Sequence, residues 1–505
     1  KKRIWCLLLA AAMVTGAAQA SHAVDFKAKG VWLASFQYGQ NGNFTNGGHT
    51  GYDPSEDEFE ARSRVRLVID AVADENLSGQ VYFEIGKSIW GKADNPQGGM
   101  ALGADASIVK LKRAFIDWRV PDTDLKLRMG IQGIGLPYMA MGGPTVFQSD
   151  VAAITASYFF NENAALTAFW ARPYNDNYVG DADGYQKNFM DNMDMAGLMV
   201  PLTFDGVKLT PWGMFASIGS NTFRKNDNYV GNKINGVNGG YALSGLFPLR
   251  ADLLSHKEKL NAYGTAWWGG LSGEITKWDP FRIAWDVNYG SVAYEDQKMN
   301  REGWLASLLL EYKLDWGTPG IYGWYSSGDD SNPRNGSERM PTVSANGNND
   351  FSNFAFNGNP YIARECVLGS TMVGTWGVGV RLKDVSFLED LKHTLRVNFM
   401  GGTNAPKMAK YVSHNSFKDP AAVARYGTSY DPLYLTTEDY ALEVGLTNTY
   451  KMYDNFTVML DAAYIAMWLD DSRSTWGKNP MRGFSGKDGG VYDAWNVNLS
   501  FVYSF

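Results

Sequence analysis

The chain has 505 residues and a net charge of −7 at pH 7, and 14% of its residues are aromatic. The excess of acidic residues makes nucleic-acid binding a poor interpretation. Beyond the first residues no apolar run is long enough for a membrane-spanning helix, the longest being residues 305–310. Glycine is abundant, with 55 residues, and proline is scarce, with 18, which is typical of long strands rich in aromatic side chains.

Residues 1–23 have the pattern of a secretory signal peptide. Residues 1–3 are basic, residues 4–14 are apolar, and two small-residue cleavage patterns end at Ala20 and Ala23. We predict that residues 24–505 form the mature protein as a single domain. Removing residues 1–23 takes away three basic residues and no acidic one, which lowers the net charge from −7 to −10. It also leaves Cys366 as the last cysteine, so no internal disulfide is expected.

Segments in which apolar and polar residues alternate follow one another along the mature chain. In residues 59–71, Phe59, Val65 and Leu67 share one face and three arginines share the other. Because side chains alternate between the two faces of a strand, each segment predicts a strand with one face suited to lipid and one to water. We predict eighteen strands, with sixteen as the alternative because the alternation is weak at 206–272. They cover residues 26–36, 59–71, 81–85, 114–118, 125–131, 151–160, 164–171, 193–204, 206–218, 260–272, 280–292, 303–315, 319–327, 372–383, 393–402, 438–452, 456–468 and 493–505.

The connections between these segments alternate between short and long. Tight turns lie near residues 121, 161, 205, 316 and 454, whereas the long connections span tens of residues and contain polar runs such as 328–333 and 346–350, which we interpret as solvated surface. Outer-membrane barrels have short turns on one side and long loops on the other. The sequence therefore predicts an all-β fold, a transmembrane antiparallel up-and-down β-barrel, with both ends of the chain on the short-turn side and an even number of strands.

In a barrel of this size the interior is too wide for side chains to fill, so we expect inward polar residues to line water. Basic residues are concentrated on three neighbouring strands, where their fields add and should enrich anions. In the alternative interpretation, the arginines of residues 62–66 pair with Asp70, Glu84 and Asp117 across strands, and the two interpretations can coexist. The predicted pore-lining residues are Arg62, Arg64, Arg66, Arg113, Asp117, Arg119, Lys126 and Arg128, and the inward set near the waist also includes Arg282, Arg381, Arg396, Glu84, Asp286 and Glu443.

The connection at residues 133–150 differs from the other long connections because it is apolar and carries a single charge, Asp150. This composition is expected if the segment folds inward against the barrel wall. We predict that this third loop narrows the channel, with Tyr138, Phe147 and Asp150 at the constriction.

Several motifs together resemble the trimeric general porins. They are the signal peptide, the Arg-x-Arg-x-Arg pattern at 62–66, the Leu-x-Leu-x-Met-Gly pattern at 125–130 before an inserted loop, and Phe505. The segment Val24-Asp25-Phe26-Lys27-Ala28-Lys29-Gly30 is similar, more narrowly, to the homotrimeric porins of sulphate-reducing bacteria.

The resemblance implies a homotrimer in the outer membrane of a Gram-negative bacterium, in contact with lipid and lipopolysaccharide. It also implies a third loop opposite basic residues, a second long loop at about 88–109 that latches onto a neighbouring subunit, and Phe505 as an assembly signal. The sequence departs from the family in one place, because Asp150 is the one acid of its third loop.

The expected function is a channel for passive diffusion of small hydrophilic solutes and ions, with a mild anion preference. A maltoporin-like sugar channel is the alternative, motivated by the strand count and by tryptophans that could stack on sugars: Trp118, Trp268, Trp316, Trp468, Trp476 and Trp495. A structural or adhesive barrel stays open because the outer loops are long. An enzyme is not expected, because Gly-x-Ser-x-Gly and His-Glu-x-x-His motifs are lacking.

No cofactor or metal is expected. Acidic groups in the long loops could bind calcium or bridge to lipopolysaccharide, but solvated loop acids are the favoured interpretation. These groups are Asp329-Asp330, Asp470-Asp471 and Asp53 with Glu56, Asp57 and Glu58.

Overall fold

The structure is a computed structural model. It describes residues 24–46, 58–92, 99–102, 109–175, 192–219, 244–249, 263–344, 350–356, 366–412, 433–481 and 489–505. The predicted signal peptide, residues 1–23, lies outside the described residues, as do the loop acids Asp53, Glu56 and Asp57.

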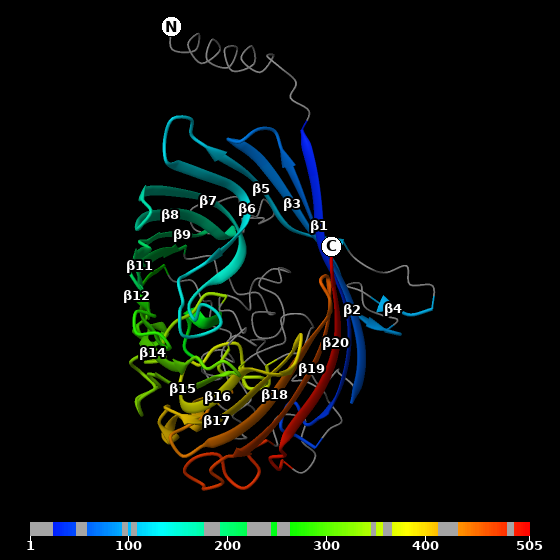
Figure 1. Ribbon diagram of the computed structural model, residues 1–505. Helices are drawn as coiled ribbons and strands as arrows, with labels where there is room; N and C mark the ends of the chain where they lie inside the picture. Colours follow the sequence, from blue (N-terminus) through cyan, green and yellow to red (C-terminus); the bar gives the residue numbers. More distant parts are fainter. Residues whose placement is uncertain are drawn as a thin grey trace.

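The chain forms one closed antiparallel β-barrel (Figure 1). Its strands are β1 (Asp25–Gln40), β2 (Phe59–Val72), β3 (Leu77–Trp90), β4 (Gly99–Met100), β5 (Val109–Arg119), β6 (Leu125–Gly135), β7 (Gln148–Asn161), β8 (Ala164–Asn175), β9 (Asn192–Met199), β10 (Leu202–Phe204), β11 (Val207–Ile218), β12 (Gly264–Ile275), β13 (Phe281–Tyr294), β14 (Arg301–Tyr312), β15 (Thr318–Ser326), β16 (Thr375–Leu388), β17 (Leu391–Gly402), β18 (Tyr440–Tyr453), β19 (Phe456–Trp468) and β20 (Ala494–Ser504). Short helical turns occur at η2 (Ser244–Leu246), η3 (Gln297–Met299), η4 (Pro406–Met408) and α4 (Ala409–Val412).

None of the helices in the described part of the chain has the length and apolar character needed to cross a membrane.

Eighteen strands make up the barrel wall, as predicted. β9 and β10 form one of them, because both pair with β8 and β11 and are separated at Val200 and Pro201, where proline lacks a backbone N–H. The two-residue β4 pairs in parallel with the end of β3 and adds no strand to the wall. β1 pairs with β20 from Val31↔Ser504 to Gln40↔Trp495, and this seam closes the barrel and leaves no long open edge.

The short connections between strands lie at one rim of the barrel and the long connections at the other, as predicted, with one exception. Short turns join β2 to β3, β5 to β6 and every second pair thereafter, while the long connections lie at the other rim. The exception is the connection from β13 to β14, which covers residues 295–300 on the long-loop side. Several predicted boundaries were wrong. β3 is Leu77–Trp90 instead of 81–85, and β5 is Val109–Arg119 instead of 114–118. The third loop covers 136–147, because β6 and β7 extend into residues 133–135 and 148–150.

Large apolar side chains occupy the outward positions of the strands. A soluble protein rarely exposes so much apolar surface, whereas a wall in contact with lipid requires it. Examples on β1 and on the strands from β7 to β20 are Trp32, Ile154, Trp170, Leu198, Phe215, Trp267, Val287, Leu308, Ile321, Val380, Phe399, Leu446, Tyr464 and Val497.

The interior has two parts, and one of them contradicts the expectation of a water-lined wall. On β7 to β15 the interior positions toward the long-loop rim are apolar and buried, as at Phe169, Met214 and Leu305. They form one cluster with loop residues such as Leu136 and Phe247. The long loops bring their own apolar side chains inward, so these wall positions pack against protein instead of water. Charged side chains such as Glu274, Arg282 and Glu311 lie toward the short-turn ends of β12 to β14.

Candidate functional site

The first charged cluster of the interior, here called the basic wall, consists of Lys112 and Arg113 on β5 and Lys126 and Arg128 on β6. Two carboxylates are each shared by two of these cations. Asp150 of β7 lies 3.2 Å from Lys112 Nζ and 2.6 Å from Arg113 Nε. Asp117 of β5 lies 3.2 Å from Lys126 Nζ and accepts hydrogen bonds from Arg128 Nε at 2.6 Å and Arg128 Nη2 at 2.8 Å.

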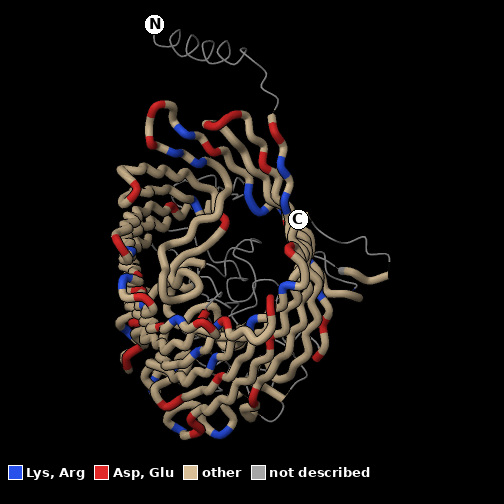
Figure 2. Tube along the Cα trace, in the orientation of Figure 1, with Lys and Arg blue, Asp and Glu red and all other residues tan. Residues whose placement is uncertain are grey.

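The cations of the basic wall are more exposed than the acids that they contact. The four basic side chains are 32–42% exposed, whereas the side chains of Asp150 and Asp117 are 20% and 15% exposed. Four cations against two carboxylates leave an excess of positive charge on this part of the wall (Figure 2). The surface that faces the interior space is therefore basic.

A cavity of about 340 Å³ adjoins the basic wall. Its lining combines the cations Lys126 and Arg128 with the hydroxyls of Thr155 and Ser157, and Phe169 supplies an apolar side. A space of this size and composition suits a small hydrated or organic anion.

The arginines of β2 are less open than the sequence suggested. Arg62 and Arg64 are only 7% and 6% exposed, and Arg62 binds Glu60 of its own strand. Arg66 pairs with Glu84 at 2.9 Å, as the alternative interpretation expected.

The other two expected partners of these arginines are taken by different side chains. Asp70 binds Lys29 of β1 and Gln80 of β3, and Asp117 binds the cations of β6. Arg119 is exposed at the end of β5.

The segment 136–147 is held against the opposite wall by Asp286 of β13. The carboxylate of Asp286 accepts hydrogen bonds from the amides of Met139, Ala140 and Met141 at 2.7, 2.9 and 3.1 Å. Arg282, two interior positions before Asp286 on β13, donates from Nη2 to the Met139 carbonyl at 2.9 Å. The segment thus crosses from β6 to interior side chains of β13.

Of the three residues predicted at the constriction, Phe147 and Asp150 do not have the expected positions. Tyr138 is 43% exposed, which agrees with a side chain that faces open space. Phe147 is 1% exposed and cannot line a channel, because the backbone of residues 146–148 pairs with residues 343 and 344 of the connection between β15 and β16. Asp150 belongs to β7 and binds Lys112 and Arg113 of β5, so it lies against the basic wall and does not face it from across the lumen.

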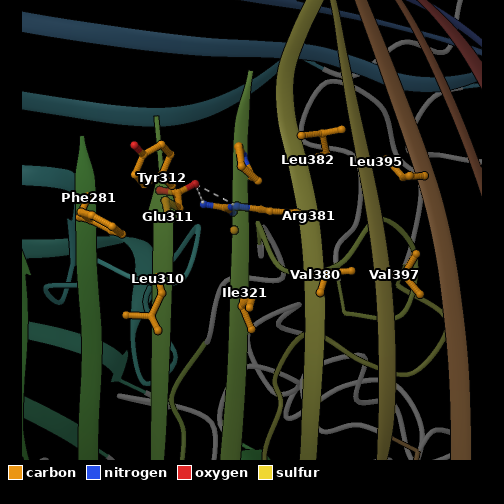
Figure 3. A pocket seen from close by; sticks show the side chains of 12 residues that line it. Phe281, Leu310, Glu311, Tyr312, Ile321, Val380, Arg381, Leu382, Leu395 and Val397 are labelled. Carbon is orange, nitrogen blue, oxygen red and sulfur yellow. Dashed lines mark hydrogen bonds and ion pairs between the residues drawn. The ribbon is translucent and has the colours of Figure 1, made fainter. Parts of the chain in front are cut away.

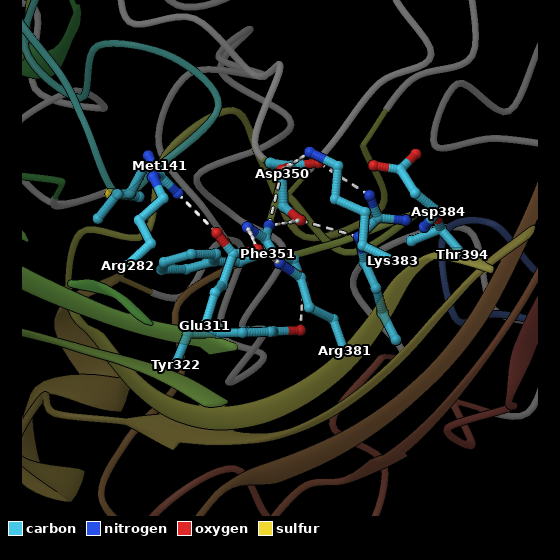
Figure 4. A network of polar contacts seen from close by, with 12 residues as sticks. Met141, Arg282, Glu311, Tyr322, Asp350, Phe351, Arg381, Lys383, Asp384 and Thr394 are labelled. Atoms are coloured by element: carbon cyan, nitrogen blue, oxygen red, sulfur yellow. Dashed lines mark hydrogen bonds and ion pairs between the residues drawn. The ribbon is translucent and has the colours of Figure 1, made fainter. Parts of the chain in front are cut away.

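A second charged cluster, here called the ionic row, runs across β11 to β17, and Figure 4 shows its part from Arg282 to Lys383. Arg282 on β13 lies between Glu274 on β12 and Glu311 on β14, at 2.5 and 2.7 Å. Arg381 on β16 continues the row from Glu311, at 2.7 Å, to Asp350, at 2.6 Å. The ionic row ends at Lys208, which binds Glu274, on one side. On the other side it ends at Lys383 and Arg396, which contact Asp350.

Strand register explains the row. Arg282, Glu311, Gly320, Arg381 and Arg396 are successive cross-strand partners on five strands. At Gly320 a Cβ atom would approach Glu311 Cγ to 3.0 Å, so glycine lets the Glu311–Arg381 pair pass over β15 (Figure 3). On the lipid-facing side of the same place, Leu310, Ile321, Val380 and other apolar side chains line a depression of about 520 Å³.

Asp350 was missed by the sequence analysis, which placed residues 346–350 on solvated surface. Residues 350–356 instead lie inside the barrel, because Glu443 of β18 accepts hydrogen bonds from the amides of Asn353, Phe354 and Ala355 at 2.6–3.2 Å. Burial alone would raise the pKa of Asp350, but Arg381, Arg396 and Lys383 hold it below the usual value, so Asp350 remains ionised at neutral pH.

The tryptophans proposed to stack on sugars lie in unsuitable places. Trp118, Trp316 and Trp468 are exposed on the outer surface or in a short turn, and Trp495 packs against the outward ring of Tyr38. Trp268 and Trp476 are buried and donate hydrogen bonds to Pro341 and Asp439. These positions do not favour a sugar channel.

Two of the remaining candidate loop acids, Asp329 and Asp470, are engaged within the protein. Asp329 is 3% exposed and accepts hydrogen bonds from Ser337 and Tyr434, and Asp470 accepts one from Ser472. Among the described residues, no group of three or more His, Cys, Asp or Glu side chains is placed to hold a metal ion.

Comparisons with known proteins relate the chain to solved structures by fold. No family model and no curated protein matches the sequence. The crystal structure of Pseudomonas aeruginosa OpdK with vanillate has a TM-score of 0.50 at 9% identity, over 95% of this chain and 98% of that chain. OccK2 (OpdF) of the same organism, in complex with glucuronate, has a TM-score of 0.50 at 11% identity, over 95% and 98%. A second structure of OpdK, described as an outer membrane protein, has a TM-score of 0.50 at 10% identity, over 95% and 99%. The chain therefore has the eighteen-stranded barrel fold of an outer-membrane protein.

Proposed function

We propose that the protein is a water-filled channel for passive diffusion of small hydrophilic solutes across the outer membrane of a Gram-negative bacterium, with a preference for anions. The observation that carries the proposal is the basic wall, where two carboxylates are shared by four more exposed cations. Interior charges select ions where the path is narrow, because salt screens a field beyond about 8–10 Å. Two proteins of the same fold were crystallised with vanillate and glucuronate, both small organic anions.

The segment 136–147 is the proposed constriction. It is fixed to β13 through Asp286 and Arg282, and it carries Tyr138 as an exposed aromatic side chain. A solute that passes this segment on its open side meets the basic wall and its cavity.

Charge selectivity tests this proposal. In a variant with Lys126→Gln and Arg128→Gln, Asp117 loses both cations that contact it, and the basic wall loses its excess of positive charge because two cations remain against two carboxylates. We expect the anion-to-cation permeability ratio, measured as a reversal potential in a KCl gradient, to fall by roughly twofold or more. Lys451→Gln is the control, because Lys451 is an exposed cation near the short-turn end of β18, away from the basic wall. An unchanged ratio in the double variant would contradict the anion preference.

We further propose that the channel is a homotrimer, embedded in lipid and lipopolysaccharide, that resembles the porins of sulphate-reducing bacteria. The loop after β3 supports this, because its strand β4 lies outside the wall (Figure 1). Met100 of β4 contacts Ser63, at an outward position of β2. A segment placed there can reach a neighbouring subunit. Light scattering of the detergent-solubilised protein should give the mass of three chains plus detergent, and the mass of a single chain would contradict the trimer.

Phe505 is the proposed assembly signal. Its backbone pairs with Gly30 across the seam, at 2.8 and 3.0 Å, while its ring is 47% exposed. Because Phe505→Ala removes the exposed ring and keeps both backbone hydrogen bonds, we expect a severalfold lower yield in the outer membrane with little change in the stability of the protein that does assemble. Tyr464→Ala on β19 removes another outward ring and should leave the yield nearly unchanged, as measured by quantitative immunoblotting of membrane fractions.

A further inference from the structure

Two arginines lie directly opposite each other inside the barrel. Arg381 on β16 and Arg396 on β17 are cross-strand partners, and both point to the interior, where their side chains are 2% and 10% exposed. Like charges directly opposite on a sheet repel each other. Lys383, two residues along β16, adds a third cation on the same face. Glu311 of β14 is a wall carboxylate that binds Arg381, but it is shared with Arg282. The wall by itself therefore presents an excess of cations here, and a further counter-ion is needed to offset it.

The counter-ion is the side chain of Asp350, which belongs to a loop and not to the wall. Its carboxylate oxygens lie 2.6 Å from Arg381 Nη1, 2.8 Å from Arg396 Nη2 and 3.8 Å from Lys383 Nζ (Figure 4). Two guanidinium groups around one carboxylate are the geometry in which proteins bind small anions. Asp350 thus occupies the place that an anion in the channel would take.

The loop does not depend on the Asp350 carboxylate to stay in place. Glu443 accepts hydrogen bonds from three amides of the segment and from the Ser352 hydroxyl. The ring of Phe351 stacks on Tyr322 with centroids 4.3 Å apart, and Tyr322 and Asn398 donate to the Phe351 carbonyl. These contacts hold residues 350–356 through their backbone and through the ring of Phe351. The Asp350 carboxylate is therefore not needed as an anchor of the segment.

We propose that Asp350 determines the ionic selectivity of this side of the channel by masking an anion-binding site made of Arg381, Lys383 and Arg396. The proposal rests on the proposed channel function. The side chains of Asp350 and Lys383 are 34% and 38% exposed, so the site is open to the interior space. With Asp350 in place, anions have their favourable path along the basic wall, on the other side of the lumen. Without it, the ionic row retains Lys208, Arg282, Arg381, Lys383 and Arg396 against only Glu274 and Glu311.

The experiment compares Asp350→Asn with Asp330→Asn in planar bilayers. Asparagine keeps the size of Asp350 and removes its charge. We expect the anion-to-cation permeability ratio of Asp350→Asn in a KCl gradient to rise by about threefold or more, because a unit charge within about 5 Å of a permeating ion matters even in water. Asp330 is an exposed acid of the same connection between β15 and β16, away from the three cations, so Asp330→Asn should leave the ratio unchanged.

Further variants separate masking from a change of loop position. Asp350→Glu keeps the charge and should keep the wild-type ratio. Adding Arg396→Gln to Asp350→Asn should reverse most of the rise in the anion-to-cation permeability ratio, because the loss of one cation offsets the loss of the Asp350 charge. If Asp350→Asn raises the conductance for both ions without changing the ratio, the side chain acts only on loop position and the proposal is overturned. A ratio equal to that of Asp330→Asn overturns it too.

The outcome also distinguishes this inference from the proposed function. A wild-type protein that does not conduct ions would contradict the channel itself. A conducting wild-type protein whose ratio responds to Lys126→Gln with Arg128→Gln, but not to Asp350→Asn, would leave the channel intact and refute the masking role alone.

Discussion

Replacing Asp286 with alanine should release the segment 136–147 from β13 and enlarge the channel. Three amides of the segment, at Met139, Ala140 and Met141, lose the carboxylate that accepts their hydrogen bonds. A hydrogen bond to a charged group contributes about 1.5–3 kcal/mol, and a buried donor left without an acceptor adds a desolvation cost. The remaining hydrogen bonds from the segment to β12 and β13, through Ser272 and Arg282, are single hydrogen bonds to carbonyls. We therefore expect a higher single-channel conductance and a noisier open-channel current.

The control for this variant is Asn288→Ala. Asn288 is the next interior position on β13 and is also buried, so its truncation removes a polar side chain of similar size from the same strand. We expect the conductance of Asn288→Ala to stay near the wild-type value. If Asp286→Ala conducts like Asn288→Ala, with equally quiet traces, then Asp286 does not hold the constriction.

Replacing Gly445 with leucine should push the segment 350–356 off the wall. A Cβ atom at Gly445 would lie 2.5 Å from the side chain of Asn353, far inside van der Waals contact. Asn353 lies three residues after Asp350, the residue that binds Arg381 and Arg396. The backbone amide of Asn353 donates a hydrogen bond to Glu443. Overpacking of this kind costs about 1–3 kcal/mol. We expect a lower unfolding temperature, measured by heat-dependent gel migration, and an altered conductance.

Gly213→Leu is the matched control for Gly445→Leu. Gly213 is an outward position of β11, and the nearest atom to a Cβ there is a backbone oxygen at 3.8 Å, so the new side chain can extend into lipid. The unfolding temperature of Gly213→Leu should remain close to that of the wild-type protein. Equal unfolding temperatures and equal conductances for the two leucine variants would show that the segment does not need the space at Gly445.

The strands could be predicted from the sequence because lipid and interior impose a period of two on every one of them. The last strand shows this well: Val497 is exposed outward, and Asn496, Asn498 and Ser500 are fully buried on the interior face. The predicted count of eighteen strands was correct even at residues 206–272, where the alternation of apolar and polar residues is weak. One strand ends there at Ile218, and the next begins at Gly264.

The interior of the barrel was predicted less well, because the position of a loop depends on partners that are distant in sequence. Residues 346–350 were interpreted as solvated from their polar composition, yet Asp350 is bound by Arg381 and Arg396. A signal was present: residues 351, 354 and 356 are phenylalanines, and all three are buried. The same apolar character indicated that residues 133–150 fold inward. The same criterion of apolar composition, applied also to the connection that contains residues 350–356, would have indicated a second inserted segment.

The pairing of Phe147 with Val343 has a consequence for the order in which the protein folds. The two residues join loops that are almost 200 positions apart in the sequence, and the apolar cluster around them draws on strands from β6 to β20. Contacts of such long range form slowly, because much of the chain must be ordered before they are made. The wall can be assembled hairpin by hairpin, but the lumen acquires its final shape only after β16 is in place. A partly inserted barrel is thus expected to be a wider and less selective pore than the finished one.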